Sequence, residues 1–101
     1  MKMVIQFDID ADMIEVPEFV VENREWLKRR FWKWLSNKSI KHKYWITVTD
    51  RSGRKYTALR YRGDAFVEWL NKKVLDKTDQ KAYMVEEHIW DYPKDMPSIF
   101  F

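Results

Sequence analysis

KYWITVTDRSGRKYTALRY, residues 43–61, is the most regular stretch of the chain and decides the predicted fold. Every second residue from Tyr44 to Val48 is apolar, which is the period of a strand with one buried face. DRSG supplies turn residues, and Gly53 can adopt the positive φ of a tight turn. KYTALRY, residues 55–61, resumes the alternation. The sequence therefore predicts a β-hairpin here.

Helical segments lie on both sides of this hairpin. Pro17 suits a first helical turn, and no further breaker interrupts the helical period from Glu18 to about Asn37. After the hairpin, Asp64 is a fair N-cap for a helix that runs to about Leu75. The outer segments 3–9 and 82–90 have the pattern of strands. The order β-α-β-β-α-β predicts an α+β fold, a ferredoxin-like sandwich with a four-stranded antiparallel sheet and two helices on one face.

The composition is that of one packed domain. Of 101 residues, 46% are hydrophobic and 35% are charged, so we expect a single α+β domain over 1–90. Residues 91–101 are predicted to be a Pro-containing tail without regular structure and with an apolar end. The absence of cysteine excludes disulfides and thiolate chemistry. No apolar run approaches the ~18 residues of a membrane span, and we expect a cytoplasmic protein without a membrane partner.

Aromatic residues are unusually abundant. Six Trp, five Tyr and six Phe make up 17% of the chain, which is more than a core of this size hides easily. We therefore expect some rings to reach the surface and bind a partner. The net charge of +3 comes from 19 basic and 16 acidic residues mixed along the chain. This balance favours a protein partner over nucleic acid.

The stretch LKRRFWKWL, residues 27–35, combines four basic residues with three aromatic ones. On a helical wheel, Leu27, Phe31, Trp34 and Leu35 face inward. Trp32 projects on the polar side of the wheel, and we expect it to be exposed and available for contact.

The helix-free face of the sheet is the second candidate surface. With Ile46, Val48 and Leu59 turned toward the helices, Lys43, Trp45, Tyr56 and Arg60 would lie on the open face. Such an arrangement is similar to the RNA recognition motif, in which aromatic rings on the sheet stack on bases. Gln6 and Glu86 on the same face depart from that pattern, and RKYTALRY lacks the motif's glycines. A single-stranded nucleic-acid-binding module that also uses Arg54 is therefore the alternative function.

Signals for catalysis are weak. His42 and His88 have no partners at a metal-binding or catalytic spacing. FDIDAD, residues 7–12, resembles the end of the first strand in VapD-type endoribonucleases, which also have a ferredoxin-like fold. The resemblance is confined to these residues and implies a Mg²⁺-dependent endoribonuclease as a third alternative. We expect Asp8, Asp10 and Asp12 to be solvated carboxylates, with no metal, cofactor or enzymatic activity.

The chain ends in MPSIFF, and its large apolar side chains would be costly to leave in water. The tail either packs on its own domain or inserts into another chain. Its acidic-then-apolar ending loosely resembles the partner-binding tip of bacterial single-stranded-DNA-binding proteins.

These observations predict a small non-catalytic binding or regulatory module that acts by protein–protein interaction. An inhibitor of a host nucleic-acid enzyme, encoded by a phage or plasmid, would have this size and lack of motifs. The sequence leaves open whether the protein forms a homodimer. The candidate binding residues are Trp32, Lys43, Trp45, Arg54, Tyr56, Arg60, Phe100 and Phe101.

Overall fold

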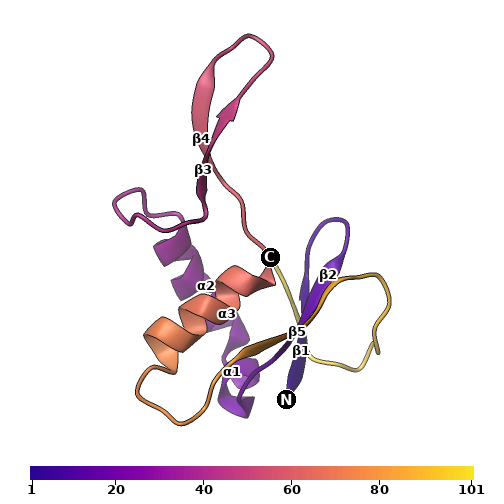
Figure 1. Cartoon of the computed structure of the whole chain (residues 1–101). Helices are drawn as coiled ribbons and strands as arrows, with labels where there is room; N and C mark the ends of the chain where they lie inside the picture. The colour runs from indigo at the N-terminus through magenta and orange to yellow at the C-terminus, as the bar shows by residue number, and fades with distance from the viewer.

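The computed structural model describes all 101 residues and has an α+β fold with two separate sheets (Figure 1). The main sheet has the order β5-β2-β1-β6 and consists of β1 (Lys2–Gln6), β2 (Ala11–Glu15), β5 (Tyr83–Ile89) and β6 (Ser98–Phe100). A two-stranded sheet consists of β3 (Trp45–Thr49) and β4 (Lys55–Leu59). The helices are α1 (Glu18–Glu22), α2 (Arg24–Leu35) and α3 (Gly63–Trp69), which continues as the π-helical turn η1 (Leu70–Val74).

The predicted ferredoxin-like topology is not confirmed. The strand expected over residues 3–9 ends at Gln6, and the Phe7 N–H donates to the carbonyl of Asp10 at 2.8 Å to close a turn. The chain then returns as β2, antiparallel to β1. This early hairpin occupies the centre of the main sheet, so the predicted hairpin forms a sheet of its own. Because β6 is parallel to β1, the main sheet is mixed.

The helix predicted from Glu18 to Asn37 is two helices that meet at Asn23. The Asn23 side chain donates to the carbonyl of Phe19 at 2.7 Å, and such local bonds compete with helix continuation. The side chains that the two helices bury are Val20, Val21, Leu27, Phe31 and Leu35. The inward positions predicted in residues 27–35 are thus confirmed except at Trp34, which is half-buried, and Phe19, which the helical wheel also places inward, is 39% exposed. No helix in the structure combines the length and apolar character needed to cross a membrane.

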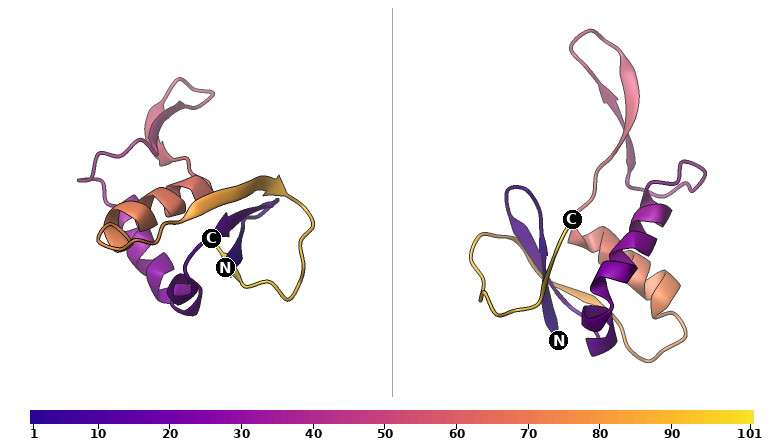
Figure 2. Two further views of the ribbon diagram at one scale, coloured as in Figure 1. Left: turned by 60° about the horizontal axis from the view of Figure 1, so that its bottom comes forward. Right: turned by 180° about the vertical axis from the view of Figure 1, so that it is seen from behind.

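The main core lies between the sheet and the helices, which pack on one side of it (Figure 2). Phe31 is fully buried at its centre. Five rings surround Phe31 at centroid distances from 5.3 to 6.2 Å, namely Trp34, Tyr61, Phe66, Trp69 and Phe101. Six of the 17 aromatic rings therefore form one cluster around Phe31, in which Trp34, Tyr61 and Phe101 are half-buried.

On the opposite side of the sheet, residues 90–97 form a wide loop between β5 and β6 (Figure 2), and Tyr92 and Met96 of this loop pack on a small cluster of β1, β2 and β5 side chains. Val4 is fully buried in a second, smaller cluster that includes Tyr92. The Gln6 side chain donates to the Tyr92 hydroxyl at 2.6 Å. The open sheet face predicted from the sequence is therefore wrong at β1, because the segment before β6 covers it, whereas Tyr83 and Val85 of β5 are exposed.

The prediction of an irregular tail is wrong for its last residues. Ser98–Phe100 form β6, and Ile99 is buried in the main core. Arg24 donates to the carbonyl of Ser98 at 2.9 Å, and Lys28 donates to the carbonyl of Phe100. Two side chains of α2 thus bind backbone carbonyl groups of β6. These hydrogen bonds fix the end of the chain on its own domain.

Candidate binding surfaces

The β3–β4 hairpin projects from the rest of the molecule (Figure 1), and we call residues 43–60 the arm. Its tip has the predicted turn chemistry. The Asp50 carboxylate accepts the N–H groups of Ser52 and Arg54, both at 2.9 Å, and Gly53 has a φ of 82°. This turn and the alternation of the two strands are local properties of the sequence, which explains why the hairpin is predicted correctly.

The two strands pair in a register that separates the predicted binding residues. Trp45 lies opposite Leu59, whereas Tyr56 lies opposite Val48. Paired residues share a face, so Trp45 and Tyr56 lie on opposite faces of the ribbon. The prediction that they share one face is wrong, because the actual register is shifted by one residue from the assumed one. Arg60 follows the alternation on the face of Tyr56, and its N–H donates to the carbonyl of Tyr44 at 2.9 Å.

Two predicted binding residues instead anchor the base of the arm. The Trp45 ring stacks on His42, with centroids 5.6 Å apart and planes at 7°, and its indole N–H donates to the carbonyl of Ile40 at 3.2 Å. Lys43 forms a salt bridge of 3.3 Å with Glu68 on α3. Lys43 stays exposed beside this salt bridge, and the other exposed candidates on the arm are Arg54, Tyr56 and Arg60.

Glu68 connects the arm base to α3 and predicts a pH effect. Hydrogen bonds from Lys72 and then from Tyr44 lower its pKa from 4.5 to about 2. A carboxyl group whose pKa is lower in the folded state stabilises the fold fully above the unfolded pKa and loses this effect as the pH falls toward the folded pKa. We expect the melting temperature of Glu68→Gln to change less than that of the wild type between pH 5 and pH 2. Glu22→Gln, at an exposed position of α1, is the control, and parallel profiles for Glu68→Gln and the wild type would contradict the assignment.

The acidic stretch at the β1–β2 turn forms an ion-pair cluster. Asp12 is fully buried and accepts hydrogen bonds from Arg62 at 2.5 Å, the Gly63 N–H at 2.8 Å and the His88 N–H at 3.1 Å. The lack of a side chain at Gly63 lets the Asp12 carboxylate lie this close to the backbone, because a Cβ at Gly63 would lie 3.0 Å from an Asp12 oxygen. The expectation of solvated carboxylates is therefore wrong for Asp12.

Asp10 completes this cluster. Its carboxylate accepts from Arg62 at 2.7 Å and shares a 2.7 Å hydrogen bond with the His88 ring. The hydrogen bonds from Arg62, and then from His88, hold the pKa of Asp10 below its ordinary value. His88 has a φ of 56° at an irregularity in the β2–β5 pairing, a conformation that these bonds help to hold. No group of three or more His, Asp or Glu side chains in the structure is arranged to hold a metal ion.

Trp32 lies at an apolar groove of about 270 Å³, which we call the Trp32 groove. The groove is lined by Lys28, Phe31, Trp32, Tyr61 and Phe101. The Trp32 side chain is 48% exposed, which confirms the prediction that it projects outward. Its ring lies 6.1 Å from Tyr61. The groove thus joins an exposed indole on α2 to the end of the chain.

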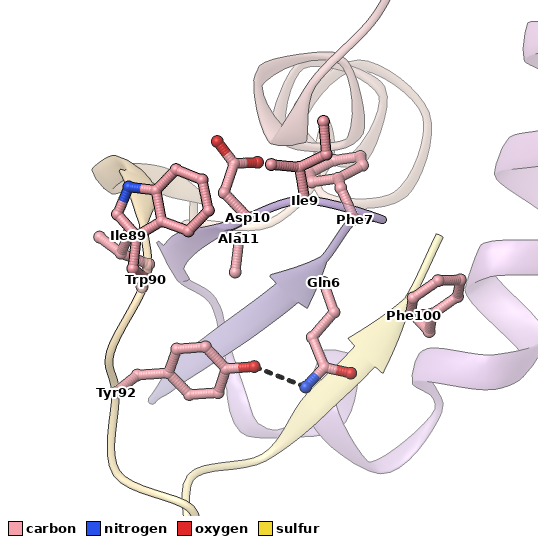
Figure 3. Close-up of a pocket in the computed structure, with 9 residues that line it drawn as sticks. All are labelled: Gln6, Phe7, Ile9, Asp10, Ala11, Ile89, Trp90, Tyr92 and Phe100. Carbon is pink, nitrogen blue, oxygen red and sulfur yellow. Dashed lines mark hydrogen bonds between the residues drawn. The ribbon is translucent and has the colours of Figure 1, made fainter.

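A second groove lies beside the β1–β2 turn (Figure 3). Its volume is about 290 Å³, and Trp90, Ile9 and Phe100 line it with exposures of 71%, 77% and 52%. Phe100, the last residue of β6, lies at this groove and Phe101 lies at the Trp32 groove, because successive side chains of an extended chain point to opposite sides. The sequence analysis missed Ile9 and Trp90. The Asp residues on both sides of Ile9 and the Asp91–Pro93 stretch after Trp90 were the signals of turns that leave both side chains outside.

Comparisons with protein-family models, with curated proteins and with solved structures found no match to this chain.

Proposed function

We propose that this protein is a non-catalytic binding module that docks onto a partner protein through the Trp32 groove. The observation that carries this proposal is the grouping of Trp32, Tyr61 and Phe101 around one apolar hollow on the surface. Large rings that border such a hollow are the usual energetic centre of protein interfaces. A hollow of about 270 Å³ lies at the lower limit for a small-molecule site and suits an anchoring side chain.

Lys28, which lines the groove on a helix of net positive charge, indicates the chemistry of the partner. Helix α2 has five basic residues, Arg24, Lys28, Arg29, Arg30 and Lys33, and only one acidic residue, Glu25. A complementary segment would insert an aromatic or aliphatic side chain and flank it with acidic residues. We propose that the module acts in the cytoplasm as a regulator, of which an inhibitor of a nucleic-acid enzyme is one form.

Trp32→Ala tests this proposal, with Trp26→Ala as a matched control. Both rings belong to α2 and are about equally exposed, at 48% and 52%. Trp26 lies away from the groove, under the guanidinium of Arg30 at 4.9 Å. For the protein captured from the native host, we expect Trp32→Ala to weaken binding by about 30-fold, as for a hot spot, and Trp26→Ala by less than about threefold.

Equal binding by the two variants would rule out the Trp32 groove. Sedimentation of the purified protein measures its oligomeric state. A dimer of this 12.5 kDa chain that dissociates in Trp32→Ala would mean that a second copy, and not another protein, occupies the groove.

A further inference from the structure

We propose that the arm binds double-stranded DNA by placing the β3–β4 ribbon in the major groove. The arm has five basic residues and one acidic residue, whereas the other 83 residues have 14 basic and 15 acidic residues. The arm therefore has a net charge of +4, equal to that of α2, and the remaining residues are acidic on balance. Lys and Arg concentrated on one projecting element are the electrostatic footprint of phosphate binding. The mixed charge of the whole sequence conceals this asymmetry.

The charges at the tip are available to a ligand. Arg51, Arg54 and Lys55 are exposed and take part in none of the salt bridges of the structure. The only acidic side chain of the arm, Asp50, is engaged by the N–H groups and hydroxyl of the turn. Phosphate groups would therefore meet three cations beside one carboxylate, that of Asp50, whose hydrogen bonds are made within the turn.

The shape of the arm fits a duplex groove. The major groove of B-DNA is about 12 Å wide and admits a two-stranded β-ribbon. One face of the ribbon presents exposed Thr47, Thr49 and Thr57 beside Lys55. Threonine hydroxyls and the lysine ammonium can bond to phosphates and base edges. This face is the one directed to the DNA.

A single strand fits the arm less well. Binding of unpaired bases uses aromatic rings that stack on successive bases along one basic groove. Trp45 and Tyr56 lie on opposite faces of the ribbon, and the Trp45 ring is already stacked on His42. The contacts of the arm therefore favour a duplex.

The test is fluorescence anisotropy of a labelled DNA duplex of about 20 base pairs, titrated with the full chain at about 50 and about 200 mM salt. The variant Arg51→Gln/Arg54→Gln/Lys55→Gln removes three tip charges and keeps Asp50, Ser52 and Gly53. A control, Lys73→Gln/Lys77→Gln/Lys94→Gln, removes three exposed charges elsewhere. We expect the tip variant to bind at least about tenfold more weakly and to have a smaller salt dependence, and the control to change affinity by less than about threefold.

Three results would overturn the proposal. They are no binding of the duplex by the wild type at the lower salt concentration, equal losses in the two variants, and tighter binding of a single strand of the same sequence. Near-UV circular dichroism verifies that both variants are folded. The result is independent of the partner-protein proposal, because Trp32 lies on α2 and the tip variant leaves it unchanged.

Discussion

Asp12→Ala is expected to lower the free energy of unfolding by about 3 kcal/mol, because it breaks a buried ion pair. The carboxylate is fully buried and accepts hydrogen bonds from Arg62, Gly63 and His88. Without it, two backbone N–H groups lose their acceptor, and the Arg62 guanidinium keeps only Asp10. The expected loss is a large share of the roughly 5–15 kcal/mol that stabilises a domain. Urea unfolding followed by tryptophan fluorescence measures the change.

Asp8→Ala is the matched control for this experiment. Asp8 belongs to the same β1–β2 connection but is exposed and forms none of the salt bridges. We expect it to change the stability by less than about 0.5 kcal/mol. If Asp12→Ala were as stable as Asp8→Ala, the ion-pair cluster would not hold β2, β5 and the start of α3 together.

Phe31→Ala is expected to have the largest effect on stability, about 3–5 kcal/mol. Phe31 is fully buried, and its ring is the common neighbour of five others, with Phe66 the nearest at a centroid distance of 5.3 Å. Removing the ring leaves a cavity that these rigid neighbours cannot fill. Because the chain as a whole is only marginally stable, this variant is expected to be partly unfolded at 25 °C.

Phe31→Leu keeps the measurement informative if the alanine variant does not fold. It retains most of the apolar volume, and we expect a loss of about 1–2 kcal/mol. Phe19→Ala, at a side chain of α1 that is 39% exposed, is expected to lose less than about 1 kcal/mol. Similar losses at both positions would contradict the placement of Phe31 at the centre of the core.

The sequence predicts the local elements of this fold better than their assembly. The hairpin at residues 43–61 is predicted because its alternation and its Asp50–Gly53 turn are properties of neighbouring residues. The β1–β2 hairpin is missed because the apolar alternation of residues 3–9 continues through the turn. Ile9 fits that pattern, yet it is 77% exposed in the structure. Which hairpin enters the main sheet depends on contacts between distant segments, and periodicity carries no information about them.

The candidate sites, like the fold, are predicted correctly only where they depend on neighbouring residues. A helical wheel is sufficient to predict that Trp32 is exposed, because its position depends only on α2. The groove beside it depends on Phe101, which comes from the far end of the chain. The shared face predicted for Trp45 and Tyr56 fails by a single residue of register, which moves every side chain of a strand to the other face.

Hydroxyl-radical footprinting of the free protein and of its complex with the captured partner tests the central proposal most directly. It reports the solvent access of each aromatic ring separately. We expect Trp32, Tyr61 and Phe101 to lose reactivity in the complex, whereas Trp26 and Trp90 keep it. Unchanged reactivity of Trp32 together with protection of Trp90 would contradict docking through the Trp32 groove.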